Sequence, residues 1–366
     1  MYEIENEGAL AGRATIAAGT AAHAADVAMF PYVVNSATVT TIVTIVDRGT
    51  TATQRYDASG VVGAAATNRR LHWRLNYKAG ATAEDNLAGC QEVNYYLPSS
   101  PNDIQSVDIG GKFGSTSKGV LFSDPSSNNN WNAGTTATIN YMLGKAAGAT
   151  QRGTLFVHNA DNTVSNTVYG EAMVLEFSTG AAWGYQAATT DNGVANDANA
   201  FDFSDAGGFV TNNLAATTLA PSGLLTFMPP AETTTRLFVT PMPVGPLLAT
   251  NGANAAGWSD QQVRISMVTS TGVAYDRDEN LVSGSATQDV RCVGAVNATD
   301  LVTSGALATL ANGGWGNLTL EFVAAVPAGA WTPTDTAYIT KLEYNTGGKI
   351  NGENLSGTFN NGFIMR

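Results

Sequence analysis

The chain has few charged residues, and this shortage excludes several classes of function. Only 13% of its 366 residues are charged, about half of the share in an ordinary soluble domain. The 18 basic residues are outnumbered by 30 acidic ones, giving a net charge of −12, so no basic stripe is available for nucleic acid or for anionic lipid. No apolar run reaches the roughly 20 residues that a membrane-spanning helix needs. We therefore expect neither nucleic-acid binding nor membrane insertion.

Sequence motifs of catalysis are also missing. Histidine occurs at three positions, His23, His72 and His158, and none has a carboxylate or a second histidine at metal-ligand spacing. A nucleophile elbow, a phosphate-binding loop, a dinucleotide fingerprint and a haem-attachment motif are all absent from the sequence. The sequence predicts a protein that is not an enzyme and has no resident cofactor.

Cysteine is scarce as well, since Cys90 and Cys292 are the only two. They lie too far apart to form a CxxC metal or redox motif. Three arrangements are open: a disulfide within the chain, two separate buried thiols, or a link between chains. In an exported protein the first is favoured. It would tie the first half of the chain to the second and contribute on the order of 4–5 kcal/mol through loop-closure entropy.

The first twelve residues, MYEIENEGALAG, are acidic and polar, which does not fit a signal peptide. We expect that a leader has been removed before this numbering begins. The predicted location is extracellular, at the cell surface.

What the chain does contain is β-branched residues and turn residues. In Val27–Asp47, two apolar runs flank the polar Asn35-Ser36-Ala37, which predicts two strands forming a first ribbon. Leu71–Lys78 alternates strictly between apolar and polar residues, as a half-exposed strand does. Similar short segments, bounded by Gly, Pro, Asn and Ser, recur along the chain. The predicted fold is all-β, a β-sandwich of the immunoglobulin or jelly-roll type with long loops.

The length allows one large sandwich or two packed sandwich domains. Composition shifts, above all a Gly/Ala/Asn/Asp-rich stretch after residue 178, suggest the boundaries. The predicted organisation is an N-terminal strand or extension over 1–26, a first β-sandwich region over 27–178, a loop-rich insertion over 179–215, and a second β-sandwich region over 216–366.

Several segments together resemble an uncharacterised family of secreted proteobacterial surface proteins. They include MFPYVVNSATVTTIVTIVD, RLHWRLNYK, VNYYLPSSPNDIQSVDIG, QQVRISMVTSTGVAYDRDEN and YITKLEYNTGGKINGENLSGTFNNGF. The shared pattern is an FPY strand, a Thr-rich strand, a YLSP-D-like segment and an AYDR(D/E)EN segment, and it spans most of the chain. The resemblance implies export, a β-sandwich fold and a cell-surface role, and it brings no catalytic residues. This chain differs in having only two cysteines and no terminal anchor, which leaves its attachment to the cell open.

One polar cluster is a candidate metal site. Asp276, Asp278, Glu279 and Asn280 place carboxylates and an amide in one turn, and oxygen ligands of this kind suit Ca²⁺. The spacing does not match the twelve-residue EF-hand loop. A solvated acidic turn, in which Arg277 pairs with a neighbour, is the competing interpretation.

Tryptophans suggest a second kind of ligand. Exposed on one face of a sandwich, they could stack against sugar rings, although tryptophan is usually largely buried. The six candidates are Trp73, Trp131, Trp183, Trp258, Trp315 and Trp331.

The N-terminal segment suggests how copies of the chain could meet. Arg13-Ala14-Thr15-Ile16-Ala17 alternates and could complete a neighbouring subunit by strand addition, or it could be an ordinary first strand. A low charge also leaves strand edges weakly protected against self-association. We predict an extracellular structural protein, the subunit of a self-assembling filament held by strand-edge or strand-exchange contacts. The alternatives are a carbohydrate-binding adhesin and a calcium-dependent surface-layer protein.

Overall fold

A computed structural model of the chain describes residues 27–47, 69–99, 102–110, 112, 120–122, 150–159, 168–178, 181–190, 223–241, 261–267, 274–321, 332–333, 337–345, 349–350, 353–354 and 358–365. Within these ranges the chain is nearly all strand, and α5 (Ser304–Thr309) is the one α-helix. The predicted all-β sandwich fold is confirmed. None of the helices in these ranges is long and apolar enough to cross a membrane.

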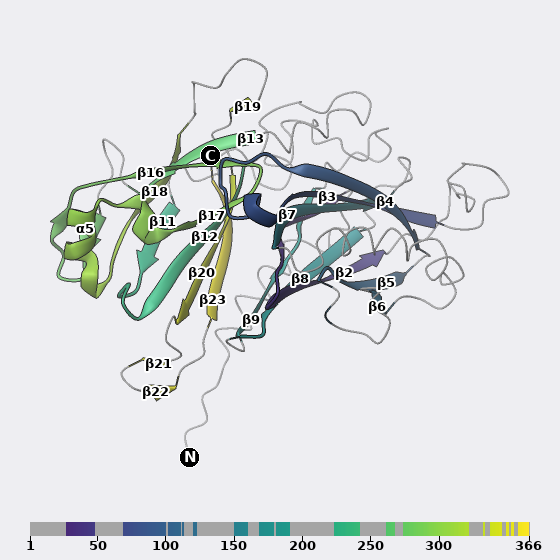
Figure 1. Cartoon of the computed structure of the whole chain (residues 1–366), viewed down its shortest axis with the longest axis horizontal. Helices are drawn as coiled ribbons and strands as arrows, with labels where there is room; N and C mark the ends of the chain where they lie inside the picture. The colour runs from purple at the N-terminus through teal and green to yellow at the C-terminus, as the bar shows by residue number, and fades with distance from the viewer. Residues whose placement is uncertain are drawn as a thin grey trace.

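The first sandwich consists of two five-stranded antiparallel sheets that face each other (Figure 1). Apolar side chains from both sheets meet in one buried cluster that includes Phe30, Trp73 and Leu155 from one sheet and Ile45 and Val107 from the other. In spatial order, the first sheet contains β10 (Ala188–Thr190), β1 (Val27–Asn35), β7 (Gln151–Asn159), β3 (Arg69–Ala79) and β4 (Gln91–Ser99), and the second contains β6 (Val120–Phe122), β5 (Asp103–Asp108), β2 (Val39–Asp47), β8 (Val168–Glu176) and β9 (Ala181–Gln186).

The second sandwich has a four-stranded and a seven-stranded sheet. Its core includes Leu237 and Ile339 from the smaller sheet and Val263, Ile265 and Leu318 from the larger one. The smaller sheet has the order β17 (Gly294–Asn297), β12 (Thr233–Pro241), β20 (Ala337–Asn345) and β23 (Thr358–Met365); the larger has β15 (Leu281–Val282), β14 (Ala274–Asp276), β18 (Gly314–Glu321), β13 (Gln261–Ser266) and β16 (Thr287–Arg291), with β11 (Gly223–Phe227) paired to β18 and β19 (Thr332–Pro333) paired to β13.

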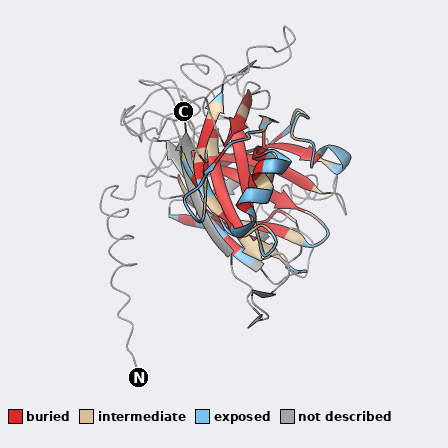
Figure 2. Ribbon diagram, turned by 90° about the vertical axis from the view of Figure 1, so that its left-hand side faces the viewer, coloured by how far each residue is buried: buried red, intermediate tan, exposed pale blue. Residues whose placement is uncertain are grey.

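Short elements complete the second half. The 3-10 helices Ala298–Leu301 and Leu310–Asn312 flank α5, and Ala306 of α5 joins the core. A small hairpin pairs β21 (Lys349–Ile350) with β22 (Glu353–Asn354). In Figure 2 the buried residues form continuous stretches along the strands, whereas exposed residues lie mainly in turns and in α5.

The two strands of Val27–Asp47 do not form a ribbon with each other, so this detail of the sequence prediction is wrong. β1 pairs with β7 and β10, while β2 pairs with β5 and β8 in the facing sheet. The two strands are connected by a side chain in place of a backbone ladder. The hydroxyl of Thr41 in β2 donates to the carbonyl of Val34 in β1 and accepts from the Val34 amide, at 2.9 Å each. The segment therefore crosses from one sheet to the other, and each strand contributes side chains to the same core.

The four sheets divide the chain at one place. All described strands of the first sandwich lie between residues 27 and 190, and all those of the second lie between 223 and 365. The predicted insertion over 179–215 begins with strands, since β9 and β10 fall inside it. Trp183 and Tyr185 alternate with small residues in β9 and pair with β8, a pattern that suits a strand. The other residues of 179–215, and residues 1–26, lie outside the described ranges.

Candidate functional site: the junction between the two sandwiches

A β-bulge in β1 starts the contact between the sandwiches. Phe30 pairs with Leu155 and Val33 with Gly153, so Pro31 and Tyr32 together oppose one residue of β7. Proline has no N–H to donate to the ladder, which makes it suited to a bulge. The extra residue lets Phe30 and Val33 both join the first core while Tyr32 joins a separate cluster at the junction.

Stacked aromatic rings form the apolar centre of this junction. The ring centroids of Tyr32 (β1) and Phe238 (β12) lie 3.7 Å apart, and those of Trp183 (β9) and Phe238 lie 5.6 Å apart. Val293 and Leu342 of the second sandwich are buried in the same cluster. Aromatic stacks of this kind add to the free energy gained by apolar burial. The two sandwiches thus share an apolar cluster that is separate from the core of each.

A disulfide joins the sandwiches at the edge of this cluster. Cys90, just before β4, is bonded to Cys292, between β16 and β17, with a Cα–Cα distance of 6.1 Å. Of the three arrangements left open by the sequence, the structure has the intramolecular one. Cys292 has a φ of 60°, a left-handed conformation that permits the sharp turn from β16 to β17.

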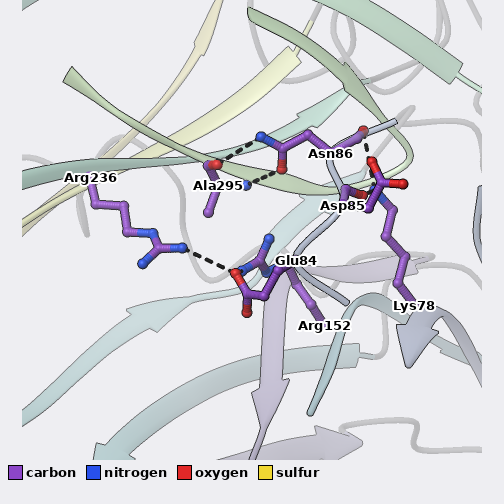
Figure 3. A network of polar contacts seen from close by, with 7 residues as sticks. All are labelled: Lys78, Glu84, Asp85, Asn86, Arg152, Arg236 and Ala295. Carbon is purple, nitrogen blue, oxygen red and sulfur yellow. Dashed lines mark hydrogen bonds and ion pairs between the residues drawn. The ribbon is translucent and has the colours of Figure 1, made fainter. Parts of the chain in front are cut away.

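Asn86 binds the backbone of the second sandwich through both ends of its amide. Its Nδ2 donates to the carbonyl oxygen of Ala295 at 2.9 Å, and its Oδ1 accepts from the Ala295 N–H at 3.0 Å (Figure 3). The Asn86 carbonyl also accepts from the amide of Arg291 at 2.8 Å. This side chain reproduces the pairing of a neighbouring strand on β17.

The turn that carries Asn86 is held by Lys78, the penultimate residue of β3. Lys78 is 1% exposed, and its Nζ donates to the carbonyl oxygens of Asp85 at 2.9 Å and Asn86 at 3.3 Å (Figure 3). Burial, followed by repulsion from Arg152, lowers the pKa of Lys78 from 10.5 to about 7. Both effects disfavour the charged form.

Glu84, in the same turn, bridges guanidinium groups of both sandwiches. Its carboxylate accepts from Arg152 of β7 and lies 3.4 Å from Nη2 of Arg236 in β12 (Figure 3). Glu84 itself is 62% exposed, so solvent screens this bridge and limits its contribution to stability.

The hydroxyl groups of two tyrosines are buried in the junction. Burial raises the pKa of Tyr32, an effect that Arg152 and Arg236 partly oppose. Burial also raises the pKa of Tyr185 well above its usual value, and the hydroxyl donates to the Tyr32 carbonyl oxygen. Thr240 of β12 donates to the neighbouring Pro31 carbonyl at 2.6 Å. These bonds satisfy the backbone groups that the bulge leaves unpaired.

The interactions at the junction attach one sandwich to the other. They are stacked aromatic rings, a disulfide, hydrogen bonds to the backbone and ion pairs. Within the described ranges, no group of three or more His, Cys, Asp or Glu side chains is placed to hold a metal ion. The arrangement joins two sandwiches into one body.

The predicted calcium ligands Asp276, Asp278, Glu279 and Asn280 are arranged differently from a metal site. Oδ1 of Asp276 accepts from the backbone amides of Asp278 at 2.9 Å and Asn280 at 2.8 Å, and both Asp276 oxygens accept from the Asn280 amide group. Asp278 instead faces Arg277. Since the carboxylate of Asp276 is occupied by N–H donors of its own turn, the structure gives these residues a role in turn formation.

The other sequence candidates are not brought together at one site in the described part of the chain. The possible inter-subunit strand Arg13–Ala17 lies outside the described residues, as do Trp131, Trp258 and Trp331. Trp73 and Trp183 are buried, at 0% and 9% exposed. Trp315 is 38% exposed, and its ring lies 4.9 Å from that of Tyr275 on the neighbouring strand. His72 and His158 occupy directly opposed positions of β3 and β7.

Sequence reasoning missed most of the junction. The alternation of Leu71–Lys78 predicts a half-exposed strand, whereas both faces of β3 are buried in the structure. No strand pattern distinguishes the turn over residues 80–90 from other loops. The sequence offers one signal there, because Gly80, Asp85 and Asn86 are residue types typical of turns. In the structure Gly80 has a φ of 61° and the Leu87 amide donates to the Asp85 side chain.

Neither models of known protein families nor curated protein sequences match this chain. The resemblance to secreted proteobacterial surface proteins therefore stays a prediction. The function must be argued from the chain's own geometry.

Proposed function

We propose that this protein is an extracellular structural protein, the subunit of a self-assembling surface filament. The observation that carries the proposal is the junction, where a disulfide, a shared aromatic cluster and the Asn86 clamp join the two sandwiches. Domains that move relative to each other have smaller and more polar contacts. A rigid two-sandwich body is suited to transmitting force along a fibre.

The disulfide supports the extracellular part of the proposal. Such bonds persist in oxidising compartments and are rare in a reducing cytosol. Cys90 and Cys292 are the only cysteines in the chain, and the structure uses both in one bond between the sandwiches. This arrangement serves a protein that must stay folded without chaperones.

Strand β4 supports the self-assembly part. β4 has nine residues and is the last strand of its sheet in the described part of the chain. An edge strand presents a row of backbone hydrogen-bonding groups to which a strand from another copy can add. The low charge of the chain leaves few repulsive groups to prevent such pairing. A filament requires only a head-to-tail contact that does not close into a ring.

Sedimentation velocity of the full chain tests the strand-exchange mechanism. We expect concentration-dependent polymers, which Ile16→Asp in the predicted donor strand should reduce and the conservative Ile16→Val should leave unchanged. Circular dichroism shows whether each variant keeps its β structure. Equal polymer fractions in the wild type and both variants would remove the role of residues 13–17 and leave the β4 edge as the contact.

Glycan binding is a second candidate, favoured by one observation. Trp315 of β18 and Tyr275 of β14 are directly opposed in register, with rings tilted by 31° on an accessible sheet face. Exposed aromatic rings can stack on the apolar face of a sugar, as they do on other flat ligands. A glycan array of the wild type and Trp315→Ala tests it: binding lost in the variant supports an adhesin, and no binding by the wild type contradicts it.

A further inference from the structure

Lys78 has an unusual environment for a lysine. It is the last member of the row Arg74, Asn76 and Lys78 on β3, each about 1% exposed. Two backbone carbonyls are the hydrogen-bond acceptors that its Nζ reaches. Burial of a lysine without a direct carboxylate partner is costly when it is charged.

The charged groups that face Lys78 come from β7, from the turn after β3 and from β16. Arg152 is directly opposite on β7, Asp85 lies in the turn above, and Arg291 ends β16 of the second sandwich. Arg152 and Arg291 disfavour the protonated lysine, and Asp85 favours it. Beyond this ring, Glu84 offsets Arg152 and Arg236. Cations therefore predominate around Nζ.

The contacts of Lys78 connect this residue to the second sandwich. The two carbonyls that it holds belong to Asp85 and Asn86. The Asn86 carbonyl is shared with the amide of Arg291, while the Asn86 side chain clamps Ala295. A change of charge on Lys78 acts directly on the turn that joins the sandwiches.

We propose that Lys78 makes the junction sensitive to pH: the contact between the two sandwiches is strongest when Lys78 is neutral and weaker when it is protonated. A neutral amine still has two N–H groups for the two carbonyls, and it is no longer repelled by Arg152 and Arg291. The pH of the surrounding solution then regulates how firmly the two sandwiches are held together. This holds whether or not the chain polymerises.

The direction follows from the pKa values in the two states. Folding lowers the pKa of Lys78 from 10.5 to about 7, so between these values the unfolded chain binds more protons at this residue than the folded chain does. Stability must therefore rise with pH over this window. Below about pH 7 both states are protonated, and the residue adds no further pH dependence.

Chemical denaturation of the wild type and Lys78→Met at a series of pH values tests the proposal. Between about pH 7.5 and 9.5, the folding equilibrium constant of the wild type should rise relative to that of the variant by about tenfold per pH unit. Lys112→Met is the matched control, because Lys112 is exposed, and its profile should run parallel to the wild type. Parallel profiles for Lys78→Met as well would overturn the proposal.

A second measurement does not depend on the variant folding. In the wild type labelled with ¹³C-lysine, one ε-carbon resonance should titrate near pH 7. Hydrogen exchange of the Arg291 and Ala295 amides, corrected for the intrinsic pH dependence, should slow progressively as the pH rises above the midpoint of that titration. Lysines that all titrate above about pH 9, or junction amides whose protection is independent of pH, would refute a pH-sensitive junction.

Discussion

Asn86 and Ala295 lie 209 positions apart in the chain, yet the side chain of one pairs with the backbone of the other as a neighbouring strand would. Both bonds have ordinary lengths, 2.9 and 3.0 Å, and cross from the first sandwich to the second. Asparagine is the one common small side chain that offers a donor and an acceptor in this geometry. The junction therefore depends on a residue that no strand pattern distinguishes.

Asn86→Ala should destabilise the protein by about 1–3 kcal/mol, because it removes two hydrogen bonds and leaves the polar groups of Ala295 unpaired. Urea denaturation measures this loss. Asn312→Ala is a suitable control, since Asn312 is exposed and its replacement should change stability by less than about 0.5 kcal/mol. Equal stabilities for the two variants would show that the clamp does not stabilise the junction.

Gly294→Ala should also be destabilising, and its effect should depend on Asn86. A Cβ added at Gly294 would lie 2.5 Å from Oδ1 of Asn86 and 2.8 Å from Cγ1 of Val290, so the clamp or the strand must shift. In the double variant Asn86→Ala/Gly294→Ala, the first clash is absent. We expect a coupling free energy of roughly 0.5–3 kcal/mol in a double-mutant cycle, whereas additive effects would mean that the two residues act independently.

Replacing both cysteines by alanine should cost roughly 2–5 kcal/mol, since the bond between Cys90 and Cys292 closes a loop across 202 positions and constrains the unfolded chain. The native folds of the two sandwiches should persist, because each has its own apolar core. Denaturation with circular dichroism measures the loss. An unchanged midpoint would show that noncovalent contacts alone hold the junction.

The turn over residues 276–280 should become less stable in strong acid. The side-chain and backbone N–H groups of Asn280 lower the pKa of Asp276 below 3.8, so the stabilisation that this carboxylate provides is present above that value and is lost as the pH falls through the lower, folded-state pKa. Asn280→Ala should return the pKa of Asp276 toward its ordinary value in an NMR titration. An unaltered titration would mean that Asn280 does not determine the charge of the turn.

The sequence was sufficient for the class of fold and for the position of many strands. Alternation over Leu71–Lys78 and the β-branched residues of Val27–Asp47 correspond to β3, β1 and β2. Such local patterns arise because strand side chains point to opposite faces in turn. Which strands pair is decided by contacts between distant segments, and this is why the prediction that β1 and β2 form one ribbon is wrong.

The junction could not be predicted from local patterns. Tyr32 faces the junction because of the bulge in β1. Lys78 is buried there because the outer face of β3 is covered. Asn86 reaches the junction because its turn contacts β17. Each depends on the relative placement of the two sandwiches, which periodicity does not encode. The two cysteines are the one long-range signal in the sequence, because their pairing predicts a contact between the two halves of the chain. Their disulfide lies at the junction.

Negative-stain electron microscopy of the full chain, concentrated under oxidising conditions, tests the proposed function most directly. If the protein is a filament subunit, the images should show uniform fibres whose axial repeat matches one two-sandwich body. Dispersed particles the size of a single chain, with residues 1–26 intact and at every concentration examined, would contradict it.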